Sequence, residues 1–359
     1  MAKGSQDSLI GVGLHLAYSK RMRVLITGHT GFKGSWLALI LAKLGHEIHG
    51  ISDVLVPNSH YEIAEVNRVM TSSRFLDIRD KVELKDATQE IHPDIVVHLA
   101  AQAFVLESYR RPFETFETNV MGTINVLEAC ELNRIERLLV ITSDKVYRIG
   151  ESKRPFIESD SLGGVDPYSS SKAAADLATQ SLSQGFTSTR VSIARAGNVI
   201  GGGDFGLDRL IPDLVRAHSK SETAFIRRPN AIRPWQHVLD CLGAYVKIMD
   251  FMFNSETSGI WNVGPDSTSL FTVREIAEKF AQLLENDSLW KTNEISPKQF
   301  KETEVLSLNS QKIREELGWI PKLDEEKAIE WTFQWYKGLF SKSSPFELTS
   351  NQINQYLSM

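Results

Sequence analysis

The sequence predicts an α/β protein, with a doubly wound parallel sheet followed by a smaller C-terminal domain. Short apolar segments alternate with helical patterns up to about residue 195, three glycines stand at the first strand–helix junction, and the alternation weakens afterwards. Strands that alternate with helices indicate βαβ units and hence a parallel sheet. The 359 residues, 42% of them hydrophobic, suffice for a large core and two modest domains.

Five short apolar segments in the first half are predicted as strands. They are residues 24–27, 47–52, 94–100, 137–142 and 190–194, and helices are predicted at 35–44 and 115–133. Because these segments are short and mostly apolar, we expect both of their faces to be buried, as in a parallel sheet.

The second half differs in character. Loops rich in glycine, proline and arginine occupy 197–206 and 226–238, and two amphipathic helices are predicted at 273–284 and 324–337. We expect this half to cover the carboxyl edge of the sheet, where open α/β folds bind ligands.

These patterns predict the division of the chain. Residues 22–195 form the sheet domain, joined by part of 232–265, and residues 196–340 form the smaller, interleaved domain. Residues 341–359 are expected to be a poorly ordered tail. Residues 1–21 are expected to be an N-terminal extension without the basic segment of an export signal, and Met22 is an alternative start.

Composition excludes several classes of function. The net charge of −5 gives nucleic-acid binding no support, and no segment approaches the roughly 20 apolar residues of a membrane span. The two cysteines, Cys130 and Cys241, lie in no metal-like cluster. We therefore expect a cytoplasmic protein without a metal, disulfides or membrane contact.

The glycines Gly28, Gly31 and Gly34 form a GxxGxxG pattern between a strand and a helix. Gly28 permits the tight turn, Gly31 the close approach of a pyrophosphate, and Gly34 the packing of the helix on the strand. The helix N-terminus favours the anion through its free N–H groups and its dipole. The pattern predicts a Rossmann-type dinucleotide site.

Lys33, inside the glycine pattern, leaves the choice of dinucleotide open. It could reach an adenosine 2′-phosphate, which favours NADP, or lie on the surface over the pyrophosphate. Asp53 follows the second strand and could hold a free ribose 2′-hydroxyl instead. Since no arginine accompanies Lys33, we favour NAD. Asp77 is placed to bind the adenine amino group, or to cap a loop.

Tyr168 and Lys172 lie four residues apart and share one face of a predicted helix. A lysine ammonium beneath a phenol favours the phenolate, and a nicotinamide cation adds to this effect. Shifting a tyrosine pKa from about 10 to near 7 requires about 4 kcal/mol, which two such charges can supply. Tyr168 is therefore the predicted general base.

Ser143, Asp144 and Lys145 follow the strand at 137–142. Ser143 is suited to bond the same substrate hydroxyl as Tyr168. Asp144 and Lys145 are a candidate acid and base, although a turn with a local ion pair would look the same.

The glycine loop together with "HLAAQ", "TNVMGT", "TSDKVY" and "DPYSSSK" resembles the extended short-chain dehydrogenase/reductase family. The longer motifs "TGHTGFKGSW", "ARAGNVIGGGD" and "RPWQHVLD" are similar to its sugar-nucleotide 4,6-dehydratases, and in particular to those of CDP-glucose. The resemblance covers about residues 22–340. It implies NAD as cofactor, a nucleotide-sugar substrate (CDP-glucose) and deoxysugar biosynthesis, as for lipopolysaccharide O-antigen.

The resemblance also implies roles. Ser143, Tyr168 and Lys172 match the catalytic triad, Asp144 the acid that assists loss of the C6 hydroxyl, and Lys145 the base at C5, where dTDP-glucose enzymes carry glutamate. The implied cofactor site comprises Gly28, His29, Gly31, Phe32, Lys33, Gly34, Asp77, Ile78, Leu99, Ala100, Ala101, Gln102, Thr142, Tyr168 and Lys172. The implied substrate site comprises Gln102, Ser143, Asn198, Arg209, Leu210, Arg233 and His237, whose charged members could instead form interdomain ion pairs.

Two other functions remain open at this point. A nucleotide-sugar 4-epimerase needs Tyr168 and Lys172 but not the pair Asp144 and Lys145. A catalytically silent NAD-binding regulatory protein would typically lose the tyrosine or the lysine. The family also implies a homodimer or a higher homo-oligomer, built on a four-helix interface of residues 113–133 and 169–184.

Overall fold

The computed structural model describes residues 21–150, 154–233, 235–265, 271–292 and 306–359. Within them, seven strands form one parallel sheet in the order β10-β6-β5-β4-β1-β2-β3. The strands are β1 (Arg23–Thr27), β2 (Glu47–Ser52), β3 (Ser72–Phe75), β4 (Ile95–His98), β5 (Arg137–Ile141), β6 (Arg190–Ala196) and β10 (Ile260–Val263). The predicted α/β fold is confirmed.

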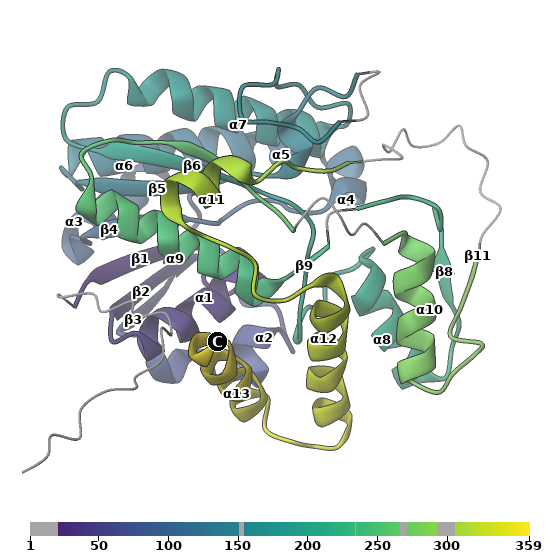
Figure 1. Ribbon diagram of the computed structural model, residues 1–359. Coiled ribbons are helices and arrows are strands. Elements are labelled where there is room, and N and C mark those ends of the chain that lie inside the picture. Colours follow the sequence, from purple (N-terminus) through teal and green to yellow (C-terminus); the bar gives the residue numbers. More distant parts are fainter. Residues whose placement is uncertain (1–20, 151–153, 234, 266–270, 293–305) are drawn as a thin grey trace, which may run out of the picture.

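Helices cover both faces of the sheet (Figure 1). One face carries α3 (Lys81–Ile91), α6 (Gly122–Leu132) and α7 (Pro167–Ser183), and the other carries α1 (Phe32–Lys43) and α9 (Val238–Asn254). The strand order reverses between β1 and β4, so the chain leaves these two neighbouring strands in opposite directions. Such a switch point opens a crevice at the carboxyl edge, which positions the site.

The predicted helix at 115–133 contains an irregular turn. It consists of α5 (Pro112–Phe116), the π-helical turn η2 (Glu117–Met121) and α6. Asn119 lies in this turn, where its amide donates to the carbonyl of Gln102 at 3.0 Å and to Ser171 Oγ at 2.9 Å. The π-turn therefore joins the loop after β4 to α7, and such turns often occur at functional sites.

The second half of the chain forms a smaller layer over the carboxyl edge. It contains α8 (Leu210–Lys220), α10 (Val273–Leu283), the paired strands β8 (Ala224–Ile226) and β11 (Trp290–Thr292), and α12 (Glu325–Phe340). Figure 1 shows these elements to one side of the sheet, whereas α9 packs on the sheet and β10 joins it by pairing with β6. Shorter elements, among them α2 (His60–Ile63) and α4 (Val105–Arg110), line the loops between the layers.

The prediction of a poorly ordered tail is wrong. Residues Pro345–Ser358 form helix α13, which packs against α12, α1 and α2. Ser344 caps its N-terminus, and the Tyr356 hydroxyl donates to Asp240 of α9 at 3.0 Å. The sequence feature that indicates this helix is Ser344 as the N-cap, followed by Pro345 at the first helical position.

The expectation of an N-terminal extension falls on residues 1–20, which lie outside the described part of the chain. Among the described residues, the model contains no helix with the length and apolar character that crossing a membrane requires.

Candidate active site

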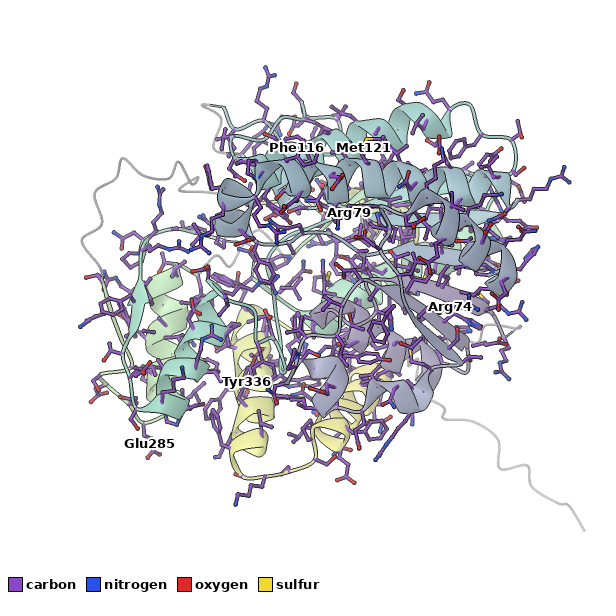
Figure 2. The ribbon with its side chains drawn as sticks, turned by 180° about the vertical axis from the view of Figure 1, so that it is seen from behind. Arg74, Arg79, Phe116, Met121, Glu285 and Tyr336 are labelled. Atoms are coloured by element: carbon purple, nitrogen blue, oxygen red, sulfur yellow. The ribbon has the colours of Figure 1, made fainter. Side chains whose placement is uncertain are left out.

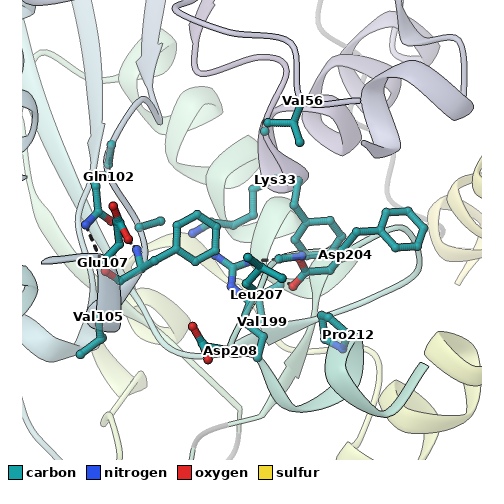
Figure 3. A pocket seen from close by; sticks show the side chains of 18 of the residues that line it. Lys33, Val56, Gln102, Val105, Glu107, Val199, Asp204, Leu207, Asp208 and Pro212 are labelled. Carbon is teal, nitrogen blue, oxygen red and sulfur yellow. Dashed lines mark hydrogen bonds and ion pairs between the residues drawn. The ribbon is translucent and has the colours of Figure 1, made fainter. Parts of the chain in front are cut away.

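A cavity of about 1650 Å³ lies at the carboxyl edge of the sheet (Figure 3). The glycine loop, the loop after β3 and the ends of β4 and β5 form one side, and α8, β8 and the segment 196–214 form the other. Its size suits two nucleotide-sized ligands side by side. Of the predicted residues, all line it except His29, Lys172 and His237.

The glycine loop fits a dinucleotide. Gly28 has φ +77°, and a Cβ there would lie 2.7 Å from the Ala100 nitrogen. A Cβ on Gly34 would lie 2.2 Å from the Gly28 carbonyl oxygen. Gly31 is the N-cap of α1 and makes no side-chain cap, so the first N–H groups of the helix face the cavity. The backbone thus forms a narrow cradle suited to a pyrophosphate.

His29 does not reach this cradle, which corrects the prediction that its side chain holds the cofactor. The ring is fully buried behind the loop, with Nδ1 2.9 Å from Ser52 Oγ and Nε2 2.7 Å from Ser73 Oγ. Burial lowers its pKa to about 4. A Cβ on Gly50 would lie 2.3 Å from this ring, so Gly50 provides its space. His29 fastens the loop to β2 and β3.

Asp77 lines the far end of the cavity, as predicted, and is held by a neighbour. Arg79 donates to both carboxylate oxygens, with Nε 2.8 Å from Oδ2, and its hydrogen bonds hold the pKa of Asp77 below its usual range. Asp53 lines the same end. Asp53 and Asp77 therefore both lie at the end of the cavity beside β2 and β3.

Lys33 matches neither of the two predicted positions. Its side chain is half-buried and crosses from α1 to α9, where Nζ lies 3.2 Å from the Tyr245 hydroxyl. It interacts electrostatically with Asp144 and Arg209, at the opposite end of the cavity from Asp53 and Asp77. Lys33 is therefore not placed to bind an adenosine 2′-phosphate, and it no longer argues for NADP over NAD.

The loop after β5 brings an acid and a base together. Ser143 Oγ donates to Asp144 Oδ1 at 2.9 Å and accepts from the Lys145 backbone N–H at 3.2 Å. Asp144 is 2% exposed, and among the described residues its Oδ2 has no hydrogen-bond partner. Burial raises its pKa, against the lowering effect of Lys145. Asp144 is therefore a carboxyl group inclined to keep its proton.

Tyr168 and Lys172 share the inner face of α7, which Asp166 caps. Lys172 Nζ donates to the Ile141 carbonyl at 2.9 Å, and burial and then the charge of Lys33 lower its pKa to about 8. Lys145 Nζ lies 5.8 Å from the centre of the Tyr168 ring.

The expected lowering of the phenol pKa does not come from the protein alone. Burial raises the pKa of Tyr168 to about 12, although its hydrogen bond with Ser143 acts in the opposite direction. Desolvation outweighs this hydrogen bond and the charge of Arg209, because a phenolate in an apolar site loses its hydration. The positive charge of NAD, when bound, would also favour the phenolate.

A buried ion pair supports this arrangement from behind. Arg195 of β6 and Asp176 of α7 are 1% and 0% exposed, and the guanidinium donates to both carboxylate oxygens at 2.9 and 2.8 Å. Thr142 donates to the same carboxylate at 2.9 Å, and Arg195 donates to the Tyr147 hydroxyl at 3.0 Å. The pair therefore holds both ends of the loop that carries Ser143. The sequence analysis missed it.

On the substrate side, Asn198, Arg209, Leu210 and Arg233 line the cavity as predicted. Arg209 donates to both Asp204 oxygens, at 3.0 and 2.9 Å, and stacks 5.0 Å from the Phe104 ring centre. Arg209 thus forms an ion pair, as the alternative interpretation of the sequence expected, and also lines the cavity. Further basic residues that the sequence analysis did not select also line this side, namely Arg216, Lys220, Arg227 and Arg228.

His237 was wrongly assigned to the substrate. It is fully buried, its ring accepts the Leu239 N–H at 3.2 Å, and the rings of Trp36 and Trp331 pack edge-on against it. Burial lowers its pKa to about 3. His237 is the N-cap of α9. Its role is therefore structural, although it belongs to the motif "RPWQHVLD" that carries the family resemblance.

Residues 24–264 match the NAD dependent epimerase/dehydratase family, and the chain belongs to this family. The chain is 37% identical to CDP-glucose 4,6-dehydratase of Salmonella typhimurium, over 94% of this chain and 96% of that protein. It is 28% identical to the human dTDP-D-glucose 4,6-dehydratase, over 91% and 93% of the two chains. The cofactor is NAD.

Solved structures share the fold. A dTDP-glucose 4,6-dehydratase from Streptomyces venezuelae with NAD bound superposes with a TM-score of 0.78 at 24% identity, covering 90% of this chain and 100% of that one. A UDP-glucose-4-epimerase from Stenotrophomonas maltophila with NAD bound gives a TM-score of 0.79 at 21% identity, covering 90% and 100%. The shared fold does not separate dehydratase from epimerase, so the site residues must.

The buried ion pair yields a prediction. Asp176→Asn leaves the guanidinium of Arg195 buried without its charge partner, which should cost roughly 3–5 kcal/mol of unfolding free energy in urea titrations. The matched control is the exposed pair of Arg74 and Glu90, where Arg74→Met should change stability by less than about 1 kcal/mol.

The double variant Asp176→Leu/Arg195→Met should recover much of the stability, because no charge is left unpaired. Its turnover should stay at least tenfold low, because Thr142 and Tyr147 lose their shared partner. Wild-type turnover in the double variant would show that the pair supports stability alone.

Proposed function

We propose that this protein is a sugar-nucleotide 4,6-dehydratase that converts CDP-glucose to CDP-4-dehydro-6-deoxy-glucose and water. The observation that carries the proposal is the pair Asp144 and Lys145, placed beside Ser143 and Tyr168 with a buried carboxyl oxygen left unpartnered. The similarity to the Salmonella enzyme supports the choice of substrate.

The first step oxidises C4 of the hexose. Tyr168 takes the proton of the C4 hydroxyl, and Ser143, which is hydrogen-bonded to Tyr168, orients the same oxygen. The glycine loop would hold NAD, which would supply the hydride chemistry at C4 and C6. Lys172, whose Nζ donates to the Ile141 carbonyl, would supply positive charge as the phenolate forms.

The second step removes water. The new C4 carbonyl acidifies the C5 proton, which Lys145 takes up in its neutral form. Asp144 gives its proton to the C6 hydroxyl, the C6–O bond breaks, and a C5–C6 double bond forms. Burial raises the pKa of Asp144, which favours the protonated form that this role requires. Return of hydride to C6 and of a proton to C5 completes the product, so no net oxidation remains.

The diphosphate of the substrate has a basic lining. Asn198, Arg209 and Arg233, which line the cavity, are the residues that we assign to it. The planar guanidinium fork suits two phosphate oxygens at once. Arg209 is already oriented by Asp204, which reduces the entropy lost when the anion binds. The product would supply deoxysugar biosynthesis, as for lipopolysaccharide O-antigen.

The reaction has a direct test. Incubation with CDP-glucose should give a product lighter by one water, without net release of reduced cofactor. The dTDP-, UDP- and GDP-hexoses serve as the specificity comparison. Formation of CDP-galactose would identify a 4-epimerase, and unchanged substrate in every series would identify a silent NAD-binding protein.

Lys145 separates the two steps. In Lys145→Ala, dehydration should slow by a factor of about 10² or more, and solvent deuterium should not enter C5, because the base for that proton is gone. Mass spectrometry of the sugar measures both effects.

Lys145→Glu is the matched control, since a carboxylate can serve as the same base and should restore part of the activity. Full-rate dehydration by Lys145→Ala, with normal deuterium at C5, would assign the base elsewhere.

We also propose a cytoplasmic homodimer. Large apolar side chains are exposed along α5, η2, α6 and α7; they are Phe113, Phe116, Met121, Leu132 and Leu177. Figure 2 shows Phe116 and Met121 along the same edge of the molecule. Contiguous exposed apolar surface marks a protein interface, and two helices from each copy would bury it.

This assembly predicts the effect of one charge. Phe113 is 76% exposed, so Phe113→Glu should leave the fold intact while converting the dimer to a monomer in light scattering. An unchanged mass, or a monomeric wild-type protein, would contradict the proposed interface.

A further inference from the structure

Lys33 is a basic residue of the cavity that has no role in the proposed reaction steps. It is the second residue of α1, and its half-buried side chain lines the cavity. Its ammonium lies 3.2 Å from the Tyr245 hydroxyl and 5.6 Å from the centre of that ring. Figure 3 shows the side chain directed into the middle of the cavity.

The groups around Lys33 place its charge at the reacting end. It interacts electrostatically with Asp144 and Arg209, and it lowers the pKa of Lys172. Asp144 lies in the loop after β5, and Lys172 lies one turn after Tyr168. The end predicted for the adenosine, with Asp53 and Asp77, lies beyond β1 at β2 and β3.

A hydride can leave C4 only towards a nicotinamide ring that lies beside Tyr168 and Ser143. The ring therefore occupies the end of the cavity that Lys33 faces, and this step rests on the proposed role of Tyr168. The ring is positively charged in the oxidised cofactor and neutral in the reduced one. A fixed ammonium close to it repels only the oxidised form.

We propose that Lys33 is an electrostatic residue of the cofactor site that favours reduced over oxidised nicotinamide and so assists oxidation of C4. A like charge several ångströms away, at an effective dielectric constant of about 20, changes such a preference roughly tenfold or more. The pyrophosphate carries the same charge in both cofactor forms, so its attraction to Lys33 cancels from the preference.

The preference can be measured on the holoenzyme without substrate. The protein is equilibrated with an excess of NAD and NADH in known proportion, separated by gel filtration and denatured, and the bound ratio is quantified chromatographically. In Lys33→Met the bound ratio should move about tenfold towards the oxidised form, relative to wild type. Lys33→Arg, which keeps the charge, should stay near wild type.

Two further variants keep the test decisive. Lys33→Gln carries the same expectation as Lys33→Met should the methionine disturb folding. Tyr245→Phe removes the hydrogen-bond partner and keeps the ammonium, so its ratio should remain near that of wild type.

Other outcomes overturn the inference. An unchanged ratio with weaker binding of both forms would show that Lys33 acts on the pyrophosphate. An unchanged ratio with unchanged binding would show that it only packs against Tyr245. Since no sugar is present, failure of the dehydratase assay with every nucleotide sugar would overturn the proposed reaction and leave this measurement intact.

Discussion

The arrangement of the catalytic groups depends on the buried pair of Arg195 and Asp176. Removing two charges from water is costly, and only a complete set of partners offsets the cost. Here the carboxylate accepts from the guanidinium, Thr142 and Gln180, and the guanidinium also donates to Tyr147 and the Glu158 carbonyl. These partners come from α7, from both ends of the loop after β5 and from the segment around Glu158, so the hydrogen bonds of the pair fix these segments relative to one another.

Burial also shifts the pKa values of the groups in front of this pair. It raises those of Tyr168 and Asp144 and lowers those of Lys172 and Lys33. A raised pKa suits the role of Asp144, because an acid must hold a proton. The two lysines differ from it: burial lowers the pKa of Lys172 only to about 8, and for Lys33 the charge of Asp144 acts against the effect of burial. Bound ligands would add a cation on the nicotinamide ring and anions on the phosphates.

The sequence predicted five of the seven strands of the sheet, all but β3 and β10, because the signals of those five strands are local. Apolar runs, glycine spacing and the interval between Tyr168 and Lys172 each act within a few residues. The failures share a different cause. The direction of the Lys33 side chain depends on Tyr245, more than two hundred residues away, and His29 is drawn inward by Ser52 and Ser73. Arg195 stands in a motif quoted for the resemblance and Asp176 lies one helical turn after Lys172, yet only the fold shows that the two side chains meet.

Epimerases and dehydratases share the serine, tyrosine and lysine that oxidise C4, so the difference must lie in what happens to the ketone. An epimerase needs the sugar to turn and present its other face, and groups that react at C5 and C6 would waste the intermediate. Here Asp144 holds an unpartnered buried oxygen, and Lys145 lies over the Tyr168 ring. A carboxyl oxygen buried without a partner costs stability, and a site that performs only epimerisation gains nothing from it. The cost is understandable where that oxygen meets the C6 hydroxyl, and this is the strongest structural reason to assign the chain to dehydration.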